Sequence, residues 1–239
     1  MSLAPISESS LKDQAYTYLK TLISRVPASQ GRFITEREIA DELSMSRTPV
    51  REAFRNLEME RLLESVPNKG AWIPPLTSER MRAVLEARIV IEVFCAHRLA
   101  HRGADELAHL GALLTEQRNH CNDPGAFLLI DRRFHSAIVE TAEQEVFSHF
   151  YGSIEDWQLR MGAGAVESNE ERMAQVLAEH QQILDSILAK DPEAIRRSIE
   201  MHIENTHLAL RLSGPRSLLG SVGMSGLDEL GRGQRRAAS

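Results

Sequence analysis

The stretch TEREIADELSMSRTPVREAFRNLEMER, residues 35–61, decides how the first part of the chain folds. Its opening T-x-x-E pattern, Thr35 and Glu38, is a capping box, which predicts that a helix begins just after Thr35. Residues 44–46 interrupt the apolar pattern of that helix. Ser46 is a good N-cap, because its hydroxyl can satisfy a free backbone N–H of the next turn. The stretch therefore predicts two short helices joined by a tight turn.

The second of these helices carries its arginines at its N-terminal end. Val50, Phe54 and Leu57 are spaced to face inward. The side chains left to point outward near the front are Arg47, Thr48, Arg51 and Arg55. A helix, a short turn and a second helix can place a recognition helix in the DNA major groove. The alternative is an ordinary pair of surface helices with solvated arginines.

Two short strand-like runs follow the second helix, at residues 62–66 and 71–73. The residues between them, Pro67-Asn68-Lys69-Gly70, are turn formers. A helix-turn-helix followed at once by a hairpin is a winged helix, and the tip of its wing can reach the DNA backbone or minor groove.

These residues carry a specific resemblance. SRTPVREAFRNLE at residues 46–58, followed by PNKGAWI at residues 67–73, closely resembles the DNA-binding domain of the GntR family of bacterial transcription regulators. The resemblance runs from about Leu11 to Ile73. The chain departs from the family at Ser44 and Arg61, where the family often has glycine, so unusual backbone angles are expected at both positions.

The resemblance also implies roles for individual residues. Arginines of the motif would contact bases or phosphates, serine and threonine at the helix start would touch phosphate, and the wing tip would meet DNA. In that order, the implied contacts are Arg37, Arg47 and Arg51; Ser46 and Thr48; and Lys69 and Gly70.

Composition limits the class of protein. The chain has 239 residues, 42% of them apolar, and two cysteines, Cys95 and Cys121, without a C-x-x-C pattern. We expect reduced thiols in a cytoplasmic protein, without a signal peptide or a membrane span. The net charge is −6, but residues 1–76 hold ten basic and ten acidic side chains. DNA binding would therefore depend on arginines that share one face, and would be steeply salt-dependent.

The chain divides into five predicted parts. Tandem prolines after the wing cannot continue a strand or a helix and mark a linker. The predicted parts are a disordered N-terminus at 1–10, the winged helix-turn-helix domain at 11–73, the linker at 74–78, a helical domain at 79–212 and a disordered tail at 213–239.

The helical domain contains no strand signal. Its breaks fall at glycines and at two Asp-Pro pairs, which combine an N-cap with a proline at the first helical position. The predicted helices are 78–102, 104–120, 123–141, 143–162, 168–189 and 192–212. The fold class is therefore mainly α, a winged helix-turn-helix followed by an antiparallel all-helical bundle of about six helices.

One acidic residue and three histidines of the helical domain can converge. Asp131 and His135 are spaced i, i+4 and face the same way on one helix. His180 and His202 lie eleven residues before and after the turn at Asp191, so an antiparallel hairpin brings them level. Three His and one Asp suit a divalent metal, Zn²⁺ or Ni²⁺, with positions left open for water or ligand. The alternative is a set of separate surface or core histidines.

The same region carries a second resemblance. From about Thr77 to Leu212, the order D-x-x-x-H, then E-H, then a histidine in the last helix resembles the FCD ligand-binding domain, which defines the FadR subgroup of the GntR family. The resemblance implies a metal that helps hold a small carboxylate effector. The implied metal ligands are Asp131, His135, His180 and His202. Arg88 matches an arginine that points into the effector pocket, although a surface ion pair is an equal alternative for it.

Together these patterns favour a DNA-binding transcriptional regulator controlled by a small carboxylate effector. It would act as a homodimer on a near-palindromic operator in double-stranded DNA. The alternative is a metal-dependent hydrolase or other metalloenzyme on a helical bundle. Against it, no separate general acid or base stands out, because Glu179 is expected to point to a different helix face from His180. A helical scaffold without DNA binding would leave the arginines and the wing without a purpose.

Overall fold

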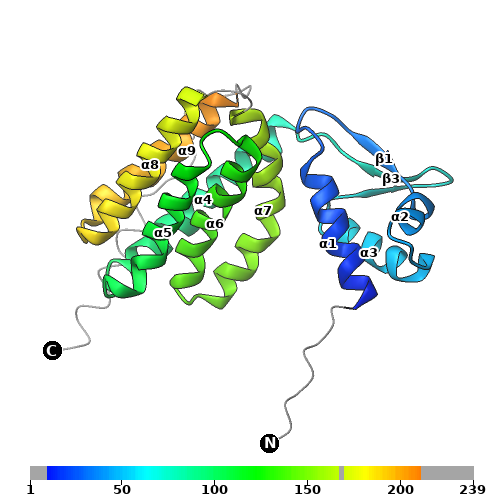
Figure 1. The fold of residues 1–239 in the computed structure, drawn as a ribbon, viewed down its shortest axis with the longest axis horizontal. Coiled ribbons are helices and arrows are strands. Elements are labelled where there is room, and N and C mark those ends of the chain that lie inside the picture. The colour runs from blue at the N-terminus through cyan, green and yellow to red at the C-terminus, as the bar shows by residue number, and fades with distance from the viewer. Residues whose placement is uncertain (1–9, 167–169, 211–239) are drawn as a thin grey trace, which may run out of the picture. The chain divides into compact units, whose positions relative to one another are not determined.

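The computed structural model describes residues 10–166 and 170–210, and the chain divides after Leu76 into two compact units (Figure 1). The predictions of disorder for residues 1–10 and 213–239 lie almost wholly outside the described residues. Within the described part, no helix is both long enough and apolar enough to span a lipid bilayer.

The N-terminal unit is a winged helix-turn-helix, as predicted. Its helices are α1 (Leu11–Ser24), α2 (Glu36–Glu42) and α3 (Arg47–Met59). Its strands are β1 (Arg32–Ile34), β2 (Glu64–Val66) and β3 (Gly70–Ile73), antiparallel in the order β1-β3-β2. The β2–β3 hairpin is the predicted wing, whereas β1 was not predicted from the sequence.

One face of each helix fills the core of this unit. α1 contributes Ala15, Leu19 and Ile23, all fully buried, and α3 contributes the predicted Val50, Phe54 and Leu57. The Tyr16 hydroxyl donates to Glu60 at 2.7 Å and joins α1 to the end of α3. The three helices therefore hold each other in place behind the exposed front of α3.

The local signals of the motif are mostly borne out. The Thr35 hydroxyl accepts a hydrogen bond from the Glu38 backbone at 3.1 Å and starts α2. Ser44 and Arg61 have φ values of +52° and +60°, the conformation that the departures from glycine suggested. One expectation was wrong: Ser46 occupies the N-cap of α3, but its side chain makes no cap hydrogen bond and stays exposed.

The second unit is a bundle of helices, as predicted. Its elements are α4 (Ser78–Leu99), the short 3₁₀ turn η1 (Asp105–Leu107), α5 (Ala108–Asn119), α6 (Pro124–Thr141), α7 (Glu145–Val166), α8 (Glu170–Leu188) and α9 (Pro192–Ala209). Both Asp-Pro pairs start helices, since Asp123 accepts from the Ala126 backbone and Asp191 from the Glu193 and Ala194 backbones. The segment predicted as one helix over 104–120 is divided into η1 and α5.

Helix α4 runs through the middle of the bundle (Figure 1). It packs against α6, α7, α8 and α9, while α5 packs against α6 and α8. Several charged and polar side chains are buried in this arrangement beside aliphatic ones, among them Arg88 and Glu92 on α4. Buried ionic groups are rare unless they are paired, so this polar layer is the first place to look for a functional site.

Candidate metal centre and nucleic-acid interface

The bundle brings three histidines into one buried cluster. His135 on α6, His180 on α8 and His202 on α9 each offer a ligand atom, and these atoms lie within 4.8 Å of one another. The Asp131 Oδ1 atom is 3.4 Å from the His180 Nε2 atom, and the Asp131 side chain is 23% exposed. All four predicted metal ligands therefore lie together, with the carboxylate on the open side of the cluster.

Each histidine is oriented by a hydrogen bond at its Nδ1 atom. The His135 Nδ1 atom lies 2.8 Å from Glu92, that of His180 2.9 Å from the Gln117 Oε1 atom, and that of His202 2.7 Å from Glu179. Because these partners accept, each Nδ1 carries the proton and each Nε2 keeps its lone pair. The Nε2 atoms of His135 and His180 are buried without a hydrogen-bond partner. This donor set fits a divalent metal ion.

The two glutamates are themselves held by buried arginines. Glu92 accepts from the Arg88 Nε atom and from the Tyr151 hydroxyl, both at 2.7 Å. Glu179 accepts from Arg172 at 2.8 Å. Burial alone would raise the pKa of the Glu92 carboxyl, but Arg88 and His135 outweigh it and hold that pKa far below its usual range. Both glutamates are thus anionic acceptors in a largely dry interior.

A small cavity lies beside the cluster, with a volume of about 40 Å³. Its charged lining consists of Arg88, Asp131, Arg132 and Arg172, with His202 next to them. The Arg88 Nη2 atom is buried and has no hydrogen-bond partner, although the Arg88 Nε atom is bound to Glu92. Of the two alternatives for Arg88, the surface ion pair is therefore wrong: the pair exists, but it is buried and borders the cavity.

Three residues around the histidines were not predicted as part of the site: Glu92, Gln117 and Glu179. The expectation that Glu179 points away was wrong, because it was judged against its neighbour His180 rather than against the next helix. Glu179 lies twelve residues before Asp191, almost level with His202 across the hairpin. The reasoning that paired the two histidines could therefore have found Glu179 as well.

Acidification is expected to destabilise the metal-free protein between pH 7 and 5.5. Burial lowers the pKa of His180 well below its usual value, and burial together with His135 lowers that of His202 although Glu179 opposes it. The unfolded chain takes up protons below pH 6.5 while the folded chain does not, so stability present above pH 6.5 is lost as the pH falls.

The expected loss over this window is about 1–2 kcal/mol for the two groups together. Urea unfolding of chelator-treated protein at pH 7 and pH 5.5 measures it. The buried glutamates do not contribute there, because their lowered pKa values place their loss of stability below the pH at which unfolded glutamate titrates. Equal urea midpoints at the two pH values would contradict the burial of neutral histidines.

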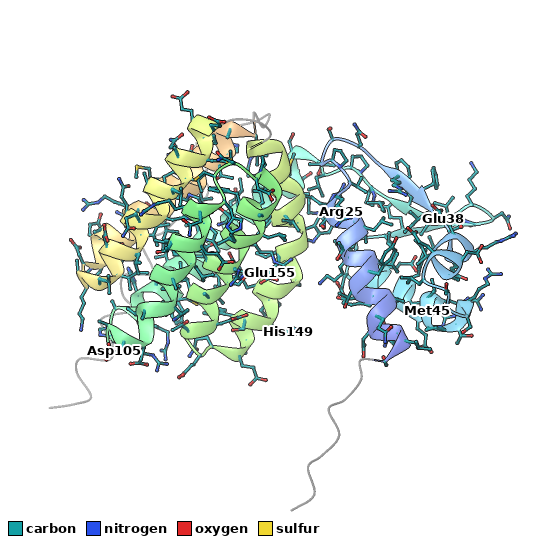
Figure 2. The ribbon with its side chains drawn as sticks, viewed as in Figure 1. Arg25, Glu38, Met45, Asp105, His149 and Glu155 are labelled. Carbon is teal, nitrogen blue, oxygen red and sulfur yellow. The ribbon has the colours of Figure 1, made fainter. Side chains whose placement is uncertain are left out.

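The predicted DNA contacts all lie on the exposed surface of the N-terminal unit. They come from α2, from the start of α3 and from the wing: Arg37, Ser46, Arg47, Thr48, Arg51, Lys69 and Gly70. Met45, in the turn between α2 and α3, is labelled in Figure 2 and marks the place of this surface. The shared exposure leaves these side chains accessible to a large ligand such as duplex DNA.

Glu36 holds two of these arginines in place. The Arg51 Nε atom lies 3.1 Å from one carboxylate oxygen of Glu36, and an Arg47 nitrogen lies 3.4 Å from the same oxygen. Arg37 is 84% exposed and pairs loosely with Asp41 at 3.7 Å. Arg47 and Arg51 therefore start from a common position, from which phosphate oxygens could displace Glu36.

Both units match known protein families. Residues 11–73 match the model described as bacterial regulatory proteins, gntR family, and residues 83–205 match the FCD domain. One relative is the galactonate operon transcriptional repressor of Escherichia coli (strain K12), 27% identical over 68% of this chain and 80% of its own. Another is the Nta operon transcriptional regulator of Aminobacter aminovorans, 30% identical over 74% of this chain and 92% of its own.

A solved structure shares the fold. The chain matches E. coli McbR/YncC with a TM-score of 0.71 and 22% sequence identity, over 85% of this chain and 98% of the other. The relatives are transcription regulators rather than enzymes, so the metalloenzyme alternative has no support. The FCD match covers more than half of the chain and adjoins a gntR match over the winged helix. The protein is therefore a transcriptional regulator of the GntR family with an FCD effector-binding domain.

Proposed function

We propose that this regulator binds a near-palindromic operator as a homodimer and that a small carboxylate, held at a metal site in the helical unit, controls the binding. The observation that carries the proposal is the cluster of His135, His180 and His202 beside the buried Arg88. Since the operator is chromosomal DNA, the protein would act in the cytoplasm.

The metal would be Zn²⁺ or Ni²⁺, held by the Nε2 atoms of the three histidines and by the Asp131 carboxylate. When bound, it would supply a Lewis acid with an open position for a carboxylate oxygen. The chain's own part is to fix the histidines through Glu92, Gln117 and Glu179 and to offer the Arg88 Nη2 group as a donor to the carboxylate.

Relatives support a carboxylate as the effector. Two of them are named for operons of galactonate and gluconate, which are themselves small carboxylates. Control by an effector requires that it bind one arrangement of the dimer more tightly than another. We propose that residues 74–78, which contain the tandem prolines, transmit that difference to the DNA-binding unit.

The DNA-binding residues would be those on the exposed face of α2, α3 and the wing. We propose that Arg37, Arg47 and Arg51 contact bases or phosphates, that Ser46 and Thr48 contact phosphates, and that Lys69 and Gly70 meet the DNA at the wing tip. The unused cap position of Ser46 supports its part, because its hydroxyl makes no bond to the helix start.

A thermal-shift screen of small carboxylates, with and without chelator, tests the effector site. A true effector is expected to raise the melting temperature of the metal-loaded protein by several degrees, as ligand at about 100 Kd stabilises by about 2.7 kcal/mol. The same compound should leave the chelated protein unchanged. Equal shifts with and without chelator would mean that the histidine cluster takes no part in effector binding.

A further inference from the structure

We infer that the cavity beside the histidines selects a monocarboxylate with a short apolar tail and rejects dicarboxylates. This inference rests on the proposed effector site and narrows the class of its ligand. It follows from a count of the charges around the cavity and from the character of its uncharged walls.

The arginines that line the cavity already have anionic partners. The Arg88 Nε atom is 2.7 Å from Glu92, and Arg172 is 2.8 Å from Glu179. Arg132 is 3.6 Å from Glu155, the α7 residue labelled in Figure 2. Each guanidinium can still donate hydrogen bonds to a ligand, but its charge is offset inside the protein.

Asp131 is the cavity's remaining carboxylate, and its ion contact is with a histidine, at 3.4 Å from His180. With the three Arg–Glu pairs neutral, the cavity lining carries a net charge of about −1 without metal. A divalent ion would change this to about +1. One carboxylate cancels that charge, whereas a second carboxylate would be buried without a cation, which costs several kcal/mol in ordinary cases.

The uncharged walls point the same way. They are mainly aliphatic, with Leu85, Leu128, Leu159, Met161 and Val176 around the cavity, and Gln158 and Thr206 as the neutral polar members. A carboxylate at the arginine end would therefore leave its tail against apolar side chains. Methyl and methylene groups gain from that contact, and a charged group does not.

Calorimetry on the metal-loaded full chain tests the inference with a matched pair of ligands, butyrate and succinate, at pH 7.5. The two have four carbons each and differ by a methyl in place of a carboxylate. Zn²⁺ is loaded after chelator treatment, and its stoichiometry is measured first. We expect butyrate to bind at least tenfold more tightly than succinate. Succinate binding as tightly as butyrate, or more tightly, would overturn the inference and leave the proposed effector site standing.

Two variants test the charge count itself. Glu179→Gln leaves the Arg172 charge without its offset, and Glu155→Gln does the same for Arg132 at a position that touches none of the histidines. Each is expected to reduce the preference for butyrate at least threefold. Glu116→Gln is the control, since it removes the same charge from the Arg133 pair outside the cavity and should not change the ratio.

The outcomes separate the two ideas. A preference that persists unchanged in both charge variants would show that the arginine pairs do not set it, and would overturn the inference. Failure of every small carboxylate to bind the loaded protein would overturn the effector site as well. If Glu179→Gln does not fold or loses its Zn²⁺, Glu155→Gln alone decides.

Discussion

Replacing Arg47 with alanine is expected to abolish specific operator binding while effector binding stays at its normal strength. Arg47 lies at the first position of α3, 61% exposed, on the surface that the winged helix presents to DNA. A lost arginine contact to a base costs about 1–3 kcal/mol. A dimer loses the contact in both half-sites, so operator affinity should fall by roughly 30-fold to more than 10⁴-fold.

Fluorescence anisotropy with labelled operator, at fixed salt, measures this loss. Arg25→Ala is the matched control, because Arg25 is an exposed arginine of the same unit at the end of α1, away from α3 (Figure 2). It removes the same charge and should change affinity only slightly. Unchanged operator affinity in the Arg47 variant would refute the assignment of the DNA-binding surface.

The ion pairs of Glu36 sharpen this expectation. Arg47 and Arg51 share that carboxylate, so DNA must take both arginines from Glu36 before it gains their full attraction. Without Arg47, Arg51 keeps Glu36 to itself and becomes less available to phosphate. The loss on Arg47→Ala should therefore exceed the loss expected from one contact alone.

The winged helix could be predicted from sequence because its signals are local. The capping box at Thr35, the turn residues and the inward spacing in α3 each act within a few residues. Strand β1 could not be predicted in this way. It has three residues, Arg32–Ile34, and exists through its pairing with β3 some forty residues later. A run of three residues carries no period that distinguishes it from a loop.

The histidine cluster could be predicted because the hairpin of α8 and α9 sets its geometry. Equal distance from the Asp191 turn brought His180 and His202 level, and the structure places the ligand atoms of the three histidines within 4.8 Å. Glu92 and Gln117 could not be found by the same reasoning. They come from α4 and α5, whose packing against α6 and α8 depends on the whole bundle.

Replacing His180 with alanine is expected to abolish metal binding and, with it, the response of operator binding to effector. His180 is fully buried, its Nε2 atom lies on the cluster and its Nδ1 atom is fixed by Gln117. Loss of an outer partner of a ligand costs roughly 10–100-fold in metal affinity, so loss of the ligand itself should cost at least roughly 100-fold.

Calorimetric titration with Zn²⁺ measures the affinity, and anisotropy with and without effector measures the response. His149→Ala is the control, because His149 is an exposed histidine on α7 and its loss should leave both readouts unchanged (Figure 2). The His180 variant should still bind operator in the absence of effector, since the winged helix is a separate unit of the chain. A variant that binds Zn²⁺ as tightly as the parent would remove His180 from the metal site. A variant that loses Zn²⁺ but keeps its effector response would detach the effector from the metal, and Arg88 would then have to hold the carboxylate without it.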